Sequence, residues 1–215
     1  MIKGAVFDAD GTLLDSMHIW DEVGERYLYS LGKLPEKNLR GILFPMTLEE
    51  SSVYLKDRYR LTESPEKIKA DVLGIIDSFY RFEVELKRGV RDYLNHLCQN
   101  GVPMAVATTS DKSQIDAALS RLGIRGFFQG IYTCSEFQTN KREPLVYLKT
   151  AEAIGVDPTE AAVFEDVLYA VKTAKGAGFF TVAVEDTASF EKREEIKKIA
   201  DLYIQDFSDP ALMKI

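Results

Sequence analysis

The chain has 215 residues, of which 46% are hydrophobic and 28% charged, and its net charge at neutral pH is −7. This composition is ordinary for a globular protein, and the length suffices for one large domain or for a core with an insert. The acidic balance argues against nucleic acid as a partner, because binding to a phosphate backbone depends on clustered lysine and arginine. No apolar run approaches the length of a membrane span, so we expect no membrane partner.

Cysteine usage indicates a reducing compartment. The two cysteines, Cys98 and Cys134, have neither the spacing of a metal site nor that of a disulfide framework. We therefore expect two reduced thiols in a cytoplasmic protein. An acidic segment by residue 8 argues against a signal peptide, and a chain of this size can work alone, so we expect a monomer.

The first predicted element is a buried strand over residues 2–7, which runs directly into Asp8 and Asp10. Alternate side chains of a strand point the same way, so these two carboxylates can converge on one small volume. They coexist there if a cation neutralises one or a proton occupies the other, and both conditions suit phosphoryl transfer. Gly11 then allows a sharp turn, and Thr12 can hydrogen-bond locally.

Two other interpretations of this acidic loop are a surface turn and a calcium loop. A calcium loop of the EF-hand kind needs further oxygen ligands at alternate positions, whereas Leu13 and Leu14 follow here. A surface turn would not normally follow a fully apolar strand. The sequence therefore favours a functional site.

Residues 16–86 have the apolar spacing that is typical of helices. Trp20, Val23, Tyr27 and Leu28 recur at helical spacing before Gly32, so we expect Trp20 in the core of this helix. Further on, Thr47 with Glu50 forms a capping-box pattern, and Ser64-Pro65 marks the start of a helix that carries Ile68, Val72, Ile76 and Tyr80 on its apolar face. This stretch contains no strand-like run.

After Gly89, helices and strands alternate. We expect strands at 103–107, 130–133, 161–164, 179–184 and 202–204, with helices between most of them. Such alternation predicts a parallel sheet covered by helices on both faces, with ligands bound at the carboxyl ends of its strands. The fold class is thus α/β: a core of residues 1–15 and 87–215, and an inserted helical cap of residues 16–86 with hinges near residues 15–16 and 87–89.

Polar residues follow two of these core strands. Thr108, Thr109 and Ser110 end the strand at 103–107, where hydroxyl and backbone N–H groups can hold a phosphate oxygen; the alternative is ordinary helix capping by Ser110 or Asp111. The acid pair at 165–166 ends another strand. Two neighbouring acids at such a place lower the stability of the fold unless they bind a ligand.

Lys141 precedes a helix that starts near Pro144. A lysine at this place could neutralise a nucleophile and a transferring phosphoryl group, although taken alone it has the pattern of a surface lysine.

Together these segments resemble the motifs of the haloacid dehalogenase (HAD) superfamily. The first motif, DxDGT followed by apolar residues and Asp-Ser, matches residues 8–16, and Thr108 falls on the second. The third, usually KPxP, reads KREP here, with Arg142 in place of the first proline. The fourth, often EDSxxG, reads EDVLYA, with Val167 and Ala170 in place of serine and glycine.

The resemblance implies a HAD-like Rossmannoid core and a phosphatase that uses Mg²⁺ on a small phosphorylated metabolite. It implies that Asp8 is the nucleophile that forms an aspartyl-phosphate and that Asp10 is the acid/base. Thr108 and Lys141 would stabilise the phosphoryl charge, and Gly11, Thr109 and Ser110 would bind phosphate. The metal site would be built from Asp8, Asp10, Asp166 and Glu165, with backbone carbonyl and water oxygens completing it.

The cap sequence favours a phosphatase over a mutase. In the beta-phosphoglucomutase-like branch, an arginine follows a cap-loop glycine by three residues and a histidine follows the second motif Asp by ten. The matching positions here are Phe44 and Trp20. Neither side chain is charged, so neither can hold a sugar phosphate by charge during the two half-reactions of a mutase. The roles of His18 and Arg40 stay open between substrate contact and ordinary exposed side chains, and Arg142 could take over the charge role of the lysine before it.

Two readings of another class are a receiver-like signalling module and a phosphate-binding module without chemistry. Receiver domains also gather acids, a hydroxyl and a lysine around Mg²⁺, but they are shorter, lack an inserted cap and carry the phosphorylated Asp on a later strand. The motif of residues 8–12 after the first strand and the inserted cap therefore argue against a receiver, and the intact Asp8, Asp10, Lys141 and Asp166 argue against a binding module without chemistry.

Overall fold

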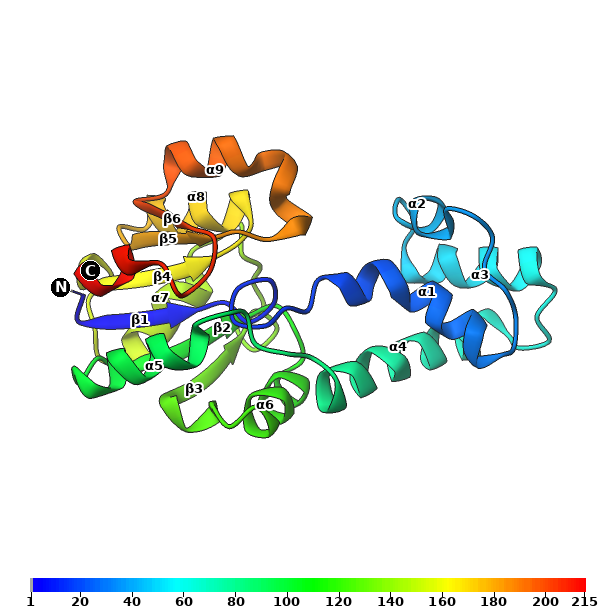
Figure 1. The fold of residues 1–215 in the computed structure, drawn as a ribbon, viewed down its shortest axis with the longest axis horizontal. Coiled ribbons are helices and arrows are strands. Elements are labelled where there is room, and N and C mark those ends of the chain that lie inside the picture. The colour runs from blue at the N-terminus through cyan, green and yellow to red at the C-terminus, as the bar shows by residue number, and fades with distance from the viewer. Residues whose placement is uncertain (1) are drawn as a thin grey trace. The chain divides into compact units, whose positions relative to one another are not determined.

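The computed structural model describes residues 2–215 and contains a six-stranded sheet (Figure 1). The strands are β1 (Gly4–Phe7), β2 (Met104–Thr108), β3 (Phe128–Thr133), β4 (Ala161–Glu165), β5 (Phe180–Val184) and β6 (Leu202–Ile204). Their order is β3-β2-β1-β4-β5-β6, and every pairing is parallel. The predicted α/β fold with a parallel sheet is therefore confirmed.

Helices cover both faces of this sheet, as the connections between parallel strands require. They are α5 (Val90–Gln99), α6 (Lys112–Arg121), α7 (Leu145–Ala153), α8 (Leu168–Gly176) and α9 (Arg193–Ile199). Side chains alternate along the strands, so Phe7 and Phe164 stack on one face near Tyr93 of α5. Val6 and Val163 point to the opposite face, where α7 and α8 pack against them.

The strand order reverses at β1, which lies between β2 and β4. Open α/β sheets bind ligands at such a point, outside the carboxyl ends of the strands. The register aligns Phe7 with Phe164, and the Asp8 N–H donates to the Phe164 carbonyl over 3.0 Å. This register brings Asp8 alongside Glu165 as the two strands end.

The chain divides into two compact units, one of residues up to Met17 together with Val84–Ile215 and one of His18–Glu83. The second unit is helical and consists of α1 (His18–Ser30), α2 (Leu39–Leu43), α3 (Leu48–Tyr59) and α4 (Pro65–Phe82). The predicted capping box opens α3, with the Glu50 N–H donating to Thr47 Oγ1 over 3.2 Å and the Thr47 N–H donating to Glu50 Oε2 over 2.8 Å.

One expectation about the helical unit is wrong, and one of its helices was not expected. Trp20 is 47% exposed and Ile19 is fully buried in its place, because one step along a helix turns the side chain by about 100° and α1 packs through the neighbouring face. The short helix α2 was not predicted, because its five residues give too little periodicity to separate them from the charged segment before it.

The two segments that connect the units run beside each other. Leu14 and Leu86 form an antiparallel bridge, and the Asp15 N–H donates to the Glu85 carbonyl over 3.0 Å. The Lys87 N–H donates to the Leu13 carbonyl over 3.0 Å, so the returning segment is bonded to the loop that carries Asp8 and Asp10. Of the helices in residues 2–215, none is both long and apolar enough to cross a bilayer.

Candidate active site

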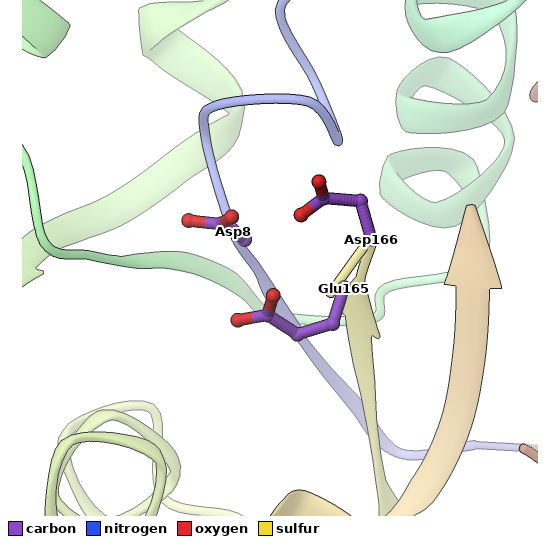
Figure 2. Close-up of side chains that lie close together, drawn as sticks. All are labelled: Asp8, Glu165 and Asp166. Carbon is purple, nitrogen blue, oxygen red and sulfur yellow. The ribbon is translucent and has the colours of Figure 1, made fainter. Parts of the chain in front are cut away.

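Three buried carboxylates meet at the carboxyl ends of β1 and β4. Asp8 comes from the end of β1, and Glu165 and Asp166 from the end of β4, as Figure 2 shows. Each offers an oxygen, and these oxygens all lie within 4.8 Å of one another. Close carboxylates in a dry site repel one another, so this arrangement needs a positive partner.

Lys141 supplies one positive charge. Its Nζ contacts Asp8 Oδ1 and lies 2.6 Å from Glu165 Oε1, and its side chain is only 3% exposed. Burial opposes the ammonium charge, but the carboxylates of Asp8 and Glu165 outweigh burial and raise the pKa of Lys141. The lysine is thus a charged member of the cluster and not a surface residue.

Tyr147 is a member of this cluster that sequence reasoning missed. It lies on α7, is fully buried, and its hydroxyl donates to Glu165 Oε1 over 2.7 Å. Burial, followed by the charge of Glu165, raises the pKa of this phenol, so it remains a donor. The only signal in the sequence was a tyrosine six residues after Lys141, and such a tyrosine cannot be told from an ordinary core residue of a helix.

Three carboxylates face one lysine in this cluster. Burial first, then repulsion from Glu165, raises the pKa of Asp8 despite Lys141, and burial with repulsion from Asp8 raises the pKa of Asp166. Within the described chain, Glu165 Oε2 and Asp166 Oδ2 are buried without a hydrogen-bond partner. Hard, unpartnered carboxylate oxygens are the donor set that Mg²⁺ takes, so these residues fit a magnesium ion.

Asp10 lies beside this cluster in a separate hydrogen-bond arrangement. Its Oδ1 accepts from Ser16 Oγ over 2.7 Å, and its Oδ2 accepts from Ser110 Oγ over 2.5 Å. The cap of α6 is Asp111, whose carboxylate accepts from the Ser113 N–H over 2.8 Å. Of the two capping candidates, Asp111 therefore caps the helix, and Ser110 is left to orient Asp10.

Thr108 and Thr109 differ in placement. Thr108 is fully buried, and its Oγ1 accepts from the Ser110 N–H over 3.0 Å, which shapes the loop after β2. Thr109 is exposed at the loop surface.

Gly11 has a φ of 73°, and a Cβ there would lie 2.5 Å from Asp166 Oδ2. Only glycine permits this approach. Thr12 does not behave as expected: its hydroxyl is buried and finds no partner among residues 2–215, because the loop bonds instead through the backbone of Ala9 and Leu14.

The residues whose roles the sequence left open each have a neighbour. The ring of His18 packs edge-on against Phe79, and Arg40 forms an ion pair with Asp21 over 2.6 Å. Arg142 lies over the ring of Tyr169, with its guanidinium carbon 4.6 Å from the ring centroid.

Comparison with known proteins gives a consistent result. Residues 5–184 match the model of the family described as haloacid dehalogenase-like hydrolase. The chain is 25% identical to a phosphorylated carbohydrates phosphatase of Thermotoga maritima, over 82% of each chain. It is 27% identical to a validoxylamine A 7'-phosphate phosphatase of Streptomyces hygroscopicus subsp. limoneus, over 97% of this chain and 96% of that one. The fold resembles that of a T. maritima protein provisionally assigned as a beta-phosphoglucomutase, with a TM-score of 0.85, 22% identity and 99% of both chains covered.

Proposed function

Because the chain belongs to the haloacid dehalogenase-like hydrolase family, we propose that it is a phosphatase that hydrolyses a small phosphate monoester, such as a phosphorylated carbohydrate. The observation that carries the proposal is Lys141, buried between Asp8 and Glu165 at the end of the central strands. A buried cation bonded to a carboxylate, beside unpartnered acid oxygens, suits the attack of that carboxylate on a phosphoryl group.

Asp8 is the proposed nucleophile. One of its oxygens attacks phosphorus, and the bond from phosphorus to the ester oxygen breaks, leaving the phosphoryl group on Asp8. Lys141 offsets negative charge on Asp8 and on the transferring group throughout. The buried surroundings exclude bulk water, which strengthens these charge interactions.

Asp10 is the proposed general acid and base. In its protonated form it gives its proton to the leaving alkoxide, and it then takes a proton from the water that attacks the phosphoryl group on Asp8. Ser16 and Ser110 fix both of its oxygens, at 2.7 and 2.5 Å, and so hold the carboxyl in one orientation. A positioned group of this kind typically contributes about 10²–10⁴-fold to the rate.

Mg²⁺ is the proposed cofactor. Asp8, Glu165 and Asp166 would hold the ion, with a backbone carbonyl of Asp10 as a further donor. When bound, it supplies positive charge to the phosphoryl oxygens and to the carboxylates. The proposed phosphate site is completed by Gly11, by Ser110 and by the backbone N–H groups near Thr108 and Thr109.

The helical unit His18–Glu83 is the proposed cap, and a phosphomutase is the alternative activity. Against the mutase stand Trp20 and Phe44, which are 47% and 81% exposed and carry no charge where that branch has histidine and arginine. The enzyme is proposed to act as a cytoplasmic monomer without a nucleic-acid or membrane partner.

The test is phosphate release from a panel of phosphorylated sugars, sugar acids and nucleotides with Mg²⁺. Asp8→Asn should abolish release, whereas Asp57→Asn, the same change at an exposed helix position, should not. Asp10→Asn should slow the reaction and accumulate a phosphoryl group on Asp8, detectable by mass spectrometry of the quenched protein. Full turnover by Asp8→Asn would disprove the assignment, and conversion of beta-glucose 1-phosphate to glucose 6-phosphate would establish the mutase.

A further inference from the structure

Arg142 and Tyr169 form a cation–π pair beside the acidic cluster. The guanidinium carbon of Arg142 lies 4.6 Å from the centroid of the Tyr169 ring. The Arg142 N–H donates to Asn140 Oδ1 over 2.8 Å, which fixes the backbone that carries it. A long side chain held at its backbone and at its planar end loses little further freedom when it binds a ligand.

Both residues of this pair belong to segments that supply the site. Arg142 directly follows Lys141, whose Nζ contacts Asp8, and Tyr169 follows Asp166 in the first turn of α8. Burial, and then the charge of Glu165, raises the pKa of the Tyr169 phenol, which agrees with a ring next to the cluster. The pair therefore lies at the edge of the proposed phosphate site.

The guanidinium of Arg142 is exposed and is not neutralised by the protein. Throughout residues 2–215, no carboxylate forms an ion pair with it, although the chain has an excess of acidic groups. Arg193 provides a contrast, because it also lies over a ring, that of Phe190 at 3.9 Å, but has Glu194 at 3.5 Å. Five N–H donors in a rigid fork match a carboxylate or a phosphate.

We propose that Arg142 binds a second anionic group of the substrate, so that the preferred ester carries a carboxylate or a further phosphate besides the phosphate that is cleaved. This rests on the proposed function, because it assumes that the phosphate to be cleaved sits at Asp8. Without a bound cation the carboxylates of the cluster repel an anion, whereas the guanidinium of Arg142 attracts one at the edge of the site. Tyr169 is the positioning residue, because it fixes the plane of the guanidinium.

Binding measured without turnover tests this proposal. Alkylphosphonates cannot be hydrolysed, so calorimetry with Mg²⁺ can compare a series of two to five carbons, each with and without a terminal carboxylate. In the unmodified protein we expect the carboxylate to improve affinity by about tenfold at the length that reaches Arg142. Arg142→Met should remove this advantage, and Arg193→Met, which breaks the other cation–π pair, should retain it.

Four results separate the explanations. No carboxylate advantage at any length, or an advantage that survives in Arg142→Met, would overturn the proposal. Equal weakening of both ligands in Arg142→Met would also overturn it, because the arginine would then only offset the charge of the cluster. If the advantage is present but no ester is hydrolysed, the proposed phosphatase activity fails while the anion site stands.

Discussion

Replacing Tyr147 by phenylalanine tests the buried hydrogen bond that fixes Glu165. The change removes one hydroxyl, which donates to Glu165 Oε1 over 2.7 Å in a fully buried environment. Hydrogen bonds to charged groups contribute about 1.5–3 kcal/mol to stability. We therefore expect Tyr147→Phe to lower the free energy of unfolding by about that amount, because Oε1 keeps only Lys141 as a partner.

Tyr93 provides a matched control in the same unit. Its hydroxyl is also buried, but within the described chain it has no hydrogen-bond partner. Burial raises the pKa of this phenol, so it too is neutral. Tyr93→Phe removes an unsatisfied polar group, and we expect a change near zero or a gain of up to about 1 kcal/mol.

Urea denaturation at neutral pH, followed by circular dichroism, measures both variants. Thermal denaturation gives a second measure. For a chain of this size, a loss of about 1 kcal/mol lowers the melting temperature by roughly 2–4 °C, so that of Tyr147→Phe should fall by about 3–12 °C. An unchanged slope against urea would show that only stability changed. If Tyr147→Phe were as stable as Tyr93→Phe, the hydroxyl would contribute nothing through Glu165 and the argument would be refuted.

Three further changes have defined outcomes. Gly11→Ala should abolish phosphate release and lower stability by about 1–3 kcal/mol, since the backbone is left-handed and the Cβ would lie 2.5 Å from Asp166 Oδ2; normal activity would contradict this. Mg²⁺ at about 100 times its dissociation constant should stabilise the unmodified protein by about 2.7 kcal/mol in a thermal-shift assay, and Asp166→Asn should lose this effect. Lys87→Met should lower the free energy of unfolding in urea by about 3–5 kcal/mol, because it leaves the buried carboxylate of Asp186 without its 2.8 Å ion pair. Adding Asp186→Asn to this variant should recover part of the lost stability.

Local pattern in the sequence determined the elements of the sheet and the places where they end. The apolar runs predicted β1 and β4, and the acids that follow them were recognised as site candidates from their position at a strand end. This works because side-chain periodicity and turn residues act within a few positions of the chain. The same local logic predicted the capping box of Thr47 and Glu50.

Local pattern failed where a residue's neighbour comes from elsewhere in the chain. On a helix of period 3.6, Ile19 and Trp20 are both plausible core residues, and only the packing of α1 buries Ile19 and exposes Trp20. The choice between Ser110 and Asp111 as helix cap was settled by Asp10, which lies 100 positions from Ser110 and accepts its hydroxyl.

The tertiary structure alone decided the electrostatics of the site. Lys141 lies far along the chain from Asp8, and nothing near it in the sequence shows that its ammonium is buried between two carboxylates. Tyr147 and the Arg142–Tyr169 pair were likewise out of reach, because each contact joins segments that only the folded sheet brings together. The sequence by itself thus determined which residues are chemically able to act, and the fold decided which of them meet, since charge and hydrogen-bond interactions depend on distance in space.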